Sequence, residues 1–281
     1  MKRITRTFGL ALGAVVSLSA LAACGSDDAT STVADDCEPI AKVETVKDGT
    51  LTAAIANFPP YIGAKDGQPT GIDGELLKKV AADLCLELKA QSTSFPGVVS
   101  ALDSGKADLS AGSWTVNDER REKYELSDPV YLSLMSVGSK AGWDTIEQLE
   151  GKKVGTTTGY LFTGEAQKAL GADNVKLYQS EQAVYDDLKA GRIDAGLFTE
   201  GALAGYLTAD GNPAKIKNQV MQETPKIAMT TGTDATVVMI RKGATDLRDA
   251  VNQVLAEYQS SGELAKNLEK AGISEQSAIN G

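Results

Sequence analysis

The sequence predicts an α/β fold of two similar lobes, each with a mostly parallel sheet flanked by helices. Short apolar strands alternate with amphipathic helices along most of the chain, a pattern typical of parallel sheets with helical crossovers. A helix end, a Gly, a basic residue and an Asp leading into an apolar strand occur at 102–109 and again at 188–195. The break at 138–142 separates these units, although helix–Gly–strand punctuation also occurs without duplication.

The first 23 residues predict an export signal. Three basic residues precede an uncharged run at 8–23, which is too short and too rich in small residues to favour a lasting membrane span. Leu-Ala-Ala-Cys at 21–24 resembles the lipobox of bacterial lipoproteins, and a plain secretory signal with an incidental Cys is the alternative. We therefore expect Cys24 to carry a lipid and 24–43 to be a flexible acidic tether to the outer face of the bacterial cytoplasmic membrane.

The composition excludes several classes of function. The formal net charge is −10, and it becomes −13 once the three basic residues of the signal are removed, so nucleic acid is not an expected partner. The chain contains no His, which excludes Ser-His-Asp and Cys-His catalytic arrangements and argues against a zinc or iron site. We expect no metal and no cofactor.

The two remaining cysteines predict one disulfide. Paired cysteines in exported proteins tend to be oxidised to disulfides. Cys37 and Cys85 are therefore expected to bond and to tie the start of the folded part to the end of the first long helix. Two buried free thiols are the alternative.

The first unit begins with an alternating strand at 51–56, which ends in a Pro-fixed turn that displays Phe58. Apolar residues at helical spacing between 76 and 88 predict a helix with Asp73 near its start. Phe95 follows, and then a short helix at 98–102 that Gly105 stops.

The strand at 106–111 leads into the first candidate site. Ser113 and Thr115 place hydroxyls on either side of Trp114, and Arg120 follows five residues after Thr115. A guanidinium is a planar, permanently charged fork of donors, so this stretch is suited to hold a small carboxylate.

The second unit repeats the plan. A strand at 132–137 precedes the break, and a strand at 153–155 runs into a Thr- and Gly-rich turn at 156–162, which offers free backbone N–H groups to an anion. The repeated pattern places Ser113 and Thr199 at equivalent positions, each eight residues after its Gly. Ligands of such sheets bind beyond the carboxyl ends of the strands, so these residues are expected to face each other across a cleft. A strand at 236–240 and two helices at 247–258 and 264–271 complete the chain.

By these motifs the chain resembles the family 3 solute-binding proteins of ABC importers, the type that captures polar amino acids. Each motif is modest, but their order and spacing are specific and span most of the chain after residue 50. They are the segments 51–61 (ending Phe-Pro-Pro-Tyr), 71–76, 102–108, 118–121, 126–129, 151–155, 191–195 and 240–262.

The resemblance implies the fold of type II periplasmic binding proteins, two α/β lobes joined by two crossover strands that close on the solute like a hinge. It places residues 44–137 in lobe one, 138–240 in lobe two and 241–281 back in lobe one. It also implies an amino acid or amino-acid-like carboxylate as solute and ABC permease subunits as membrane partners. We expect the folded part to act as a monomer.

The family's binding residues carry over to matching positions. Arg120 matches the arginine that pairs with the α-carboxylate of the solute, and Ser113 and Thr115 match residues that contact its carboxylate and ammonium. The remaining matches are the aromatic residues that sandwich the solute and the lobe-two seat for its carboxylate. These are Phe58, Phe95, Thr158, Gly159 and Tyr160, with Trp114 as an added aromatic where a smaller residue is common.

Two departures leave the other end of the solute open. Thr199 stands where the family usually has an Asp that binds the α-ammonium, and Tyr160 and Leu161 stand where Thr or Ser is usual. A buried ammonium without a carboxylate is costly, so either Glu200 turns inward through a bulge or the solute carries a methylated or cyclic amine held by aromatic rings. Phe198 and Phe95 have the alternative of being core residues.

Binding is expected rather than catalysis. A small-molecule dehydratase on the same fold is the alternative, with Glu200 and Glu165 as its candidate acid and base, but neither residue lies in a recognisable catalytic constellation. A sensor ectodomain would need a signalling domain or membrane span after residue 281.

Overall fold

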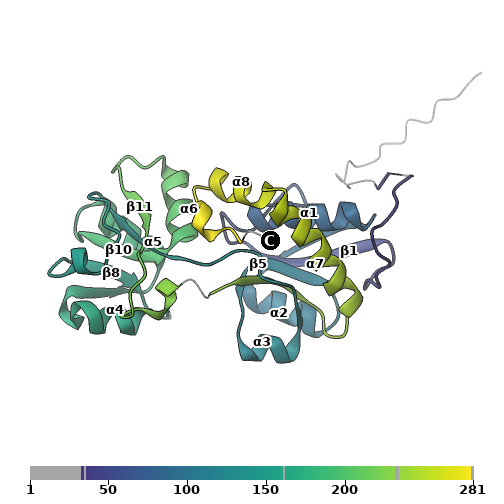
Figure 1. The fold of residues 1–281 in the computed structure, drawn as a ribbon, viewed down its shortest axis with the longest axis horizontal. Coiled ribbons are helices and arrows are strands. Elements are labelled where there is room, and N and C mark those ends of the chain that lie inside the picture. Colours follow the sequence, from purple (N-terminus) through teal and green to yellow (C-terminus); the bar gives the residue numbers. More distant parts are fainter. Residues whose placement is uncertain (1–32, 35, 161, 232–233, 280–281) are drawn as a thin grey trace, which may run out of the picture.

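The computed structural model describes residues 33–34, 36–160, 162–231 and 234–279. The predicted signal at 1–23 and the predicted lipidation site at Cys24 lie outside these residues. The molecule is elongated, with two α/β lobes that are joined near its middle by segments of chain (Figure 1). Each lobe is built on one five-stranded sheet, so the predicted two-lobed α/β fold is confirmed.

The first sheet has the strand order β4-β1-β5-β12-β6. The first three strands in this order run parallel, whereas β12 runs antiparallel to both of its neighbours. A short hairpin of β2 and β3 follows β1 in the chain. The strands are β1 (Thr50–Ala56), β2 (Gly63–Lys65), β3 (Gln68–Thr70), β4 (Glu87–Thr93), β5 (Leu109–Thr115), β6 (Glu125–Leu126) and β12 (Thr236–Ile240).

Helices cover both faces of this sheet because its central strands are apolar on both sides. Leu51 and Ile55 of β1 share a core with α1, α7 and α8, whereas Ala54 between them packs with α2 on the opposite face. The helices are α1 (Ile72–Asp83), α2 (Phe95–Asp103), α3 (Asp118–Lys123), α7 (Thr245–Ser260) and α8 (Glu263–Lys270).

The second sheet repeats this plan with the order β11-β7-β10-β8-β9. Three parallel strands are again followed by an antiparallel neighbour, so β10 corresponds to β5 and β7 to β12. Its strands are β7 (Met135–Ser139), β8 (Val154–Thr157), β9 (Val175–Tyr178), β10 (Ala195–Thr199) and β11 (Lys217–Val220), and its helices are α4 (Thr163–Leu170), α5 (Glu181–Lys189) and α6 (Glu200–Asp210). Short 3₁₀ turns complete the chain, η1 (Glu147–Leu149), η2 (Ala172–Asn174), η3 (Ala228–Thr231) and η4 (Glu275–Ser277).

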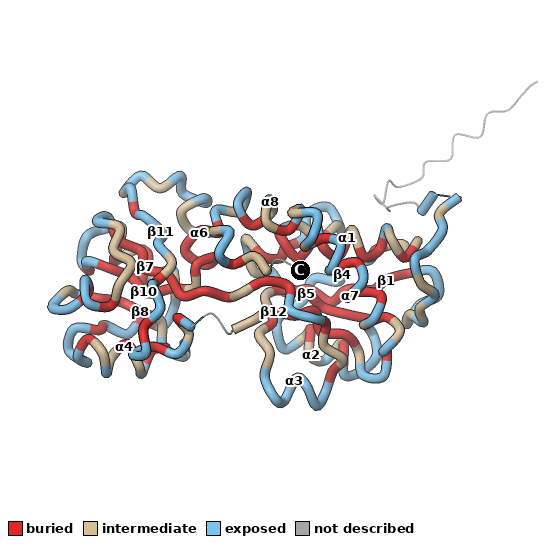
Figure 2. The backbone as a smooth tube through the Cα atoms, viewed as in Figure 1, coloured by how far each residue is buried: buried red, intermediate tan, exposed pale blue. Residues whose placement is uncertain are grey.

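Two segments cross between the sheets, one between β6 and β7 and one between η3 and β12. They meet in an antiparallel bridge between Leu132 and Ala235. The first crossover is largely buried, and buried backbone follows the strands of both lobes (Figure 2).

The strand pairing corrects the predicted lobe boundaries at both crossovers. The strand Thr236–Ile240, which the sequence places in lobe two, pairs with β5 and therefore belongs to the first sheet. β7 begins at Met135, before the predicted start of lobe two at residue 138. An apolar strand beside a crossover has the same pattern in either sheet, and only its partner decides where it belongs.

The end of the chain forms a third connection between the lobes. The Leu132 N–H of the first crossover donates to the Ser277 carbonyl at 2.8 Å, and α6 of the second lobe lies against the same terminal segment through Glu200. A second contact joins α6 to the turn after β1, where a Cβ on Gly201 would overlap the Tyr61 ring. α6 is therefore fixed against the first lobe.

The predicted disulfide is confirmed. Cys37 and Cys85 are bonded, with their Cα atoms 5.8 Å apart, and the bond ties the N-terminal segment to the chain just after α1.

Candidate functional site

The carboxyl ends of the parallel strands lie on the side where the lobes join. In the first sheet Thr115 at the end of β5 pairs with Thr236, where the second crossover enters β12. In the second sheet Thr199 at the end of β10 pairs with Met135, where the first crossover enters β7. Ligands of α/β sheets bind at this edge, so the candidate site has one wall in each lobe.

Aromatic rings line the wall of the first lobe. The Phe95 ring lies edge-on to the Trp114 ring at 5.3 Å between centroids, and the Phe58 and Phe95 rings are 5.9 Å apart. Trp114 is buried, and its Nε1–H donates to the Ser110 hydroxyl at 3.0 Å, whereas Phe95 is 41% exposed. Three predicted site residues from three different strand ends thus form one continuous aromatic cluster.

Arg120 lies beside this surface. Its guanidinium carbon is 4.9 Å from the centre of the Trp114 ring, a cation–π contact, and Nη1 donates to the Thr115 carbonyl. Asn117 caps the short helix α3 by accepting from the Arg120 backbone N–H at 2.8 Å, which fixes the start of the side chain. Burial lowers the pKa of Arg120, but a guanidinium remains charged at any physiological pH. Its other donors can take a carboxylate in a bidentate pair.

Ser113 has an unusual backbone with a supporting carboxyl. Its φ is 55°, in the left-handed region, and its N–H donates to Asp73 Oδ2 at 2.8 Å. The Tyr131 hydroxyl donates to the same oxygen at 3.0 Å. Burial raises the pKa of Asp73 to about 7. The sequence indicates Asp73 only as a helix start within the 71–76 motif, and its contact with Ser113, 40 residues further along the chain, has no local sequence signal.

The wall of the second lobe is formed by the ends of β8 and β10. The Thr158 N–H donates to the Tyr178 carbonyl at 2.8 Å, and Gly159 has a φ of 98°, a conformation that favours glycine. The Tyr160 ring stacks on Phe162 at 4.8 Å between centroids. Thr199 is half-buried and immediately precedes α6, so this wall has a Thr where the resemblance implies an acid.

Glu200 does not replace the missing acid. Its carboxylate accepts from the Ser274 N–H at 2.7 Å and from the Ser277 hydroxyl at 2.9 Å, and the residue is only 4% exposed. β10 keeps regular register up to Thr199, without the bulge that would turn Glu200 inward. The suggestion that Glu200 rotates into the site is therefore wrong for this structure.

Other candidates also have structural roles. Phe198 is fully buried in a core with α5 and α6, so it is a core residue. Glu165 accepts a hydrogen bond from the Ala228 N–H at 3.0 Å, so both candidate acid–base residues of the dehydratase alternative bind the protein's own backbone. Leu161 lies outside the described residues.

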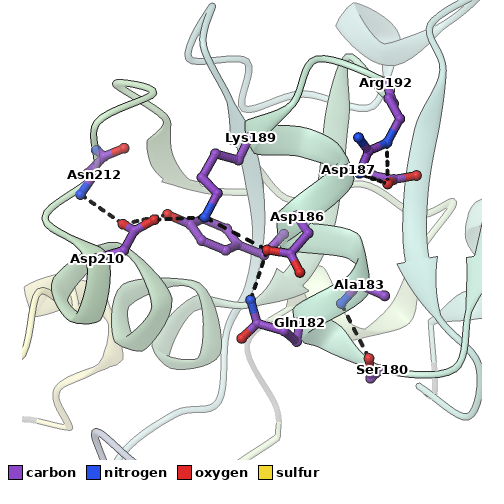
Figure 3. A network of polar contacts seen from close by, with 10 residues as sticks. Ser180, Gln182, Ala183, Asp186, Asp187, Lys189, Arg192, Asp210 and Asn212 are labelled. Carbon is purple, nitrogen blue, oxygen red and sulfur yellow. Dashed lines mark hydrogen bonds and ion pairs between the residues drawn. The ribbon is translucent and has the colours of Figure 1, made fainter.

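A network of charges on the second lobe lies away from these walls. The Tyr185 hydroxyl and the Lys189 ammonium both bind Asp210, which joins the end of α5 to the end of α6 (Figure 3). Arg192 binds Asp187 nearby (Figure 3). Because α6 runs back from the end of β10, its last residues lie near the opposite edge of the sheet. These charged residues therefore hold the helices together and are not part of the candidate site.

Within the described ranges, no group of three or more acidic or Cys side chains is arranged to hold a metal ion. None of the helices in that part of the chain is long and apolar enough to cross a membrane.

Comparison with known proteins gives a consistent picture. The family of bacterial extracellular solute-binding proteins, family 3, matches residues 51–272. The L-cystine-binding protein TcyA of Bacillus subtilis is 30% identical over 270 residues, which cover 93% of this chain and 95% of that protein. The L-cystine-binding protein TcyJ of Escherichia coli K12 is 29% identical over 228 residues, which cover 79% and 82%.

Solved structures share the fold. An amino acid ABC transporter substrate-binding protein, AbpA of Streptococcus pneumoniae, bound to L-arginine, aligns with a TM-score of 0.57 and 28% identity over 82% of this chain and 97% of its own. An ancestral cationic amino acid solute-binding protein aligns with a TM-score of 0.66 over 80% of this chain and 96% of its own, and at 24% identity it supports the fold alone.

Proposed function

We propose, because this chain belongs to the bacterial extracellular solute-binding proteins, family 3, that it captures a small carboxylate-bearing solute between its lobes and delivers it to an ABC permease. The solute is an amino acid or an amino-acid-like carboxylate with a methylated or cyclic amine. A protein of this family binds and releases its solute unchanged, so we assign no catalytic residue.

One observation carries the proposal. The Arg120 guanidinium is held over the Trp114 ring at the carboxyl end of β5, so it is oriented before any solute arrives. A preoriented guanidinium loses little entropy when it binds a carboxylate. The row of Phe58, Phe95 and Trp114 next to it supplies an apolar surface for the rest of the solute.

The amine end of the solute is less closely defined. Relatives named for cystine and structures with bound L-arginine support an amino acid. Thr199 in place of an acid, and the engagement of Glu200 elsewhere, support an amine that needs no carboxylate partner. Aromatic rings bind methylated ammonium groups by cation–π contact, which makes betaines and cyclic amines candidates beside the amino acids.

The N-terminal sequence supports a place of action at the membrane surface. We propose that Cys24 carries a lipid that holds the protein at the outer face of the cytoplasmic membrane, with the segment up to residue 43 as tether. This position keeps the solute-loaded protein near permease subunits, which are separate chains.

Arg120→Ala tests the site. A thermal-shift screen of the purified protein against L-cystine, L-arginine, L-histidine, glycine betaine and cyclic amino acids first selects the solute, and calorimetry then measures its affinity. We expect Arg120→Ala to weaken binding at least about 30-fold, since removal of a buried charged partner costs about 2–5 kcal/mol. The exposed Arg121→Ala on the same helix is the matched control. Equal affinities for the two variants would reject the assignment.

A further inference from the structure

A buried carboxyl connects the first wall of the site to the crossover between the lobes. Asp73 lies in the first turn of α1 and is 3% exposed. One of its oxygens, Oδ2, accepts both from the Ser113 N–H and from the Tyr131 hydroxyl. Ser113 precedes the residues that hold Arg120, and Tyr131 lies on the first crossover, so Asp73 bridges two parts of the machinery.

Ser113 needs this support because the sheet does not provide it. The β5–β12 pairing shifts between Val237 and Met239, which pair with Trp114 and Ser110, so the three residues 111–113 lie opposite a single residue of β12. Ser113 is left-handed at φ 55°, a conformation that non-glycine residues rarely adopt. The Asp73 oxygen accepts the backbone N–H that this bulge leaves out of the ladder.

The bulge determines where the carboxylate grip points. Trp114 and Thr115 follow Ser113 directly, and these two residues hold the Arg120 side chain by ring contact and hydrogen bond. Release of the Ser113 N–H would let the bulge relax, and the guanidinium would then lose its fixed direction.

Tyr131 connects Asp73 to the crossover segments between the lobes. Its carbonyl accepts from the Thr236 N–H of the second crossover strand at 2.8 Å, and its backbone forms a bridge with Ala278 of the terminal segment. Its ring stacks on Tyr61 at 5.5 Å, and the Tyr61 ring lies against Gly201 of the second lobe. Both crossovers and the terminal segment therefore meet at the residue that donates to Asp73.

We propose that ionised Asp73 is a positioning residue for solute binding, because it fixes Ser113 and joins the carboxylate grip to the hinge through Tyr131. This inference rests on the proposed function. Asp73 itself does not contact the solute and acts through Ser113. This role makes the affinity for a carboxylate solute depend on pH near neutrality. A protonated Asp73 accepts more weakly from the Ser113 N–H and the Tyr131 hydroxyl than an ionised one does.

The surroundings of Asp73 leave it as the group that titrates in this range. The titratable groups that interact with it are Tyr61, Tyr131 and Tyr258, and burial raises the pKa of each of these phenols. Tyr61 also interacts with Glu200 of α6. The ion pairs found within the described residues do not include Asp73, so no cation holds its charge.

A solute-free titration tests the positioning role directly. The chain has two tryptophans, so Trp143→Phe leaves Trp114, the neighbour of Ser113, as the single tryptophan, which is excited selectively over the tyrosines at the red edge of the absorption band. We expect Trp114 emission to titrate with a midpoint near pH 7, and Asp73→Asn to abolish this step. Tyr131→Phe should raise the midpoint, because it removes a hydrogen bond that favours the charged form. Glu75→Gln, an exposed neighbour on the same turn, should leave the titration unchanged and is the control.

Calorimetry from pH 5.5 to pH 8 with L-arginine, or with the solute that gives the largest thermal shift, adds the functional part. Affinity should fall up to tenfold per pH unit below the midpoint in the wild type and become nearly independent of pH in Asp73→Asn. A titration retained by Asp73→Asn, or a wild-type affinity equal at pH 6 and pH 8, would overturn the inference. If no solute binds at all, the proposed function fails, and the fluorescence titration still decides whether Asp73 controls the bulge.

Discussion

Glu200→Gln separates a structural carboxylate from a solute-binding one. The Glu200 carboxylate accepts two hydrogen bonds from the terminal segment, from the Ser274 N–H and the Ser277 hydroxyl. A hydrogen bond to a charged group stabilises by about 1.5–3 kcal/mol. Glutamine keeps one oxygen acceptor, but its NH₂ group then faces either the Ser274 N–H or the Ser277 hydroxyl, which are both donors. We therefore expect the free energy of unfolding to fall by about 3 kcal/mol. For a chain of this size that corresponds to a fall in Tm of roughly 6–12 °C.

Chemical unfolding in urea measures the stability, and calorimetry with the selected solute measures the affinity. The exposed Glu223→Gln serves as the control for loss of a surface charge. The affinity of Glu200→Gln should remain within about threefold of the wild type, because the carboxylate points to the terminal segment. An affinity reduced 100-fold together with an unchanged free energy of unfolding would show that Glu200 contacts the solute, and would refute our account.

Three further predictions concern the stability and the selectivity of the protein. Replacing both Cys37 and Cys85 by Ser should lower the free energy of unfolding by about 4 kcal/mol in urea, because the bond closes a loop across a sequence separation of 48 residues; a loss below 1 kcal/mol would contradict this. Thr199→Asp should strengthen binding of ordinary α-amino acids about 10- to 100-fold in calorimetry by adding an ammonium partner, and no gain across the panel would count against the missing-acid argument. Burial raises the pKa of Asp73 in the folded protein, so the folded state holds its proton more tightly than the unfolded state does. This proton stabilises the fold fully below pH 4, and the stabilisation is lost as the pH rises to about 7. Urea unfolding should therefore show wild type losing about 4 kcal/mol relative to Asp73→Asn across this range, and parallel curves would refute it.

The sequence predicts those parts of the fold that local patterns encode. Strand alternation placed Glu200 on the opposite side from Thr199, and its carboxylate does point to the terminal segment. The identity of its partners was not predictable, because Ser274 and Ser277 lie 74 and 77 residues further along the chain. The same limit explains β12, whose apolar pattern fits either sheet until its pairing with β5 is known.

The aromatic residues show a second limit. Phe198 and Phe95 were equal candidates for core and site, yet one is fully buried and the other is 41% exposed. Helices cover both faces of the second sheet, so a residue of β10 before its last position, Thr199, is buried whichever way it points. Phe95 instead begins α2 at the strand edge, where packing against Phe58 and Trp114 defines its place. Burial of an aromatic residue therefore depends on which element carries it and on what covers that element.

The two walls differ in what they have prepared for a solute. On the first lobe, contacts within the protein already fix Arg120 and Ser113, so the proposed carboxylate grip is preorganised. On the second lobe Thr199 supplies a hydroxyl, which cannot neutralise an ammonium. A primary ammonium gives up strong hydration when it is buried without a carboxylate, whereas a methylated one gives up less and gains from aromatic faces. Among solutes that share a carboxylate, we therefore expect the lack of an acid at Thr199 and the aromatic rings of the first wall to decide selectivity together, and to favour a quaternary over a primary amine.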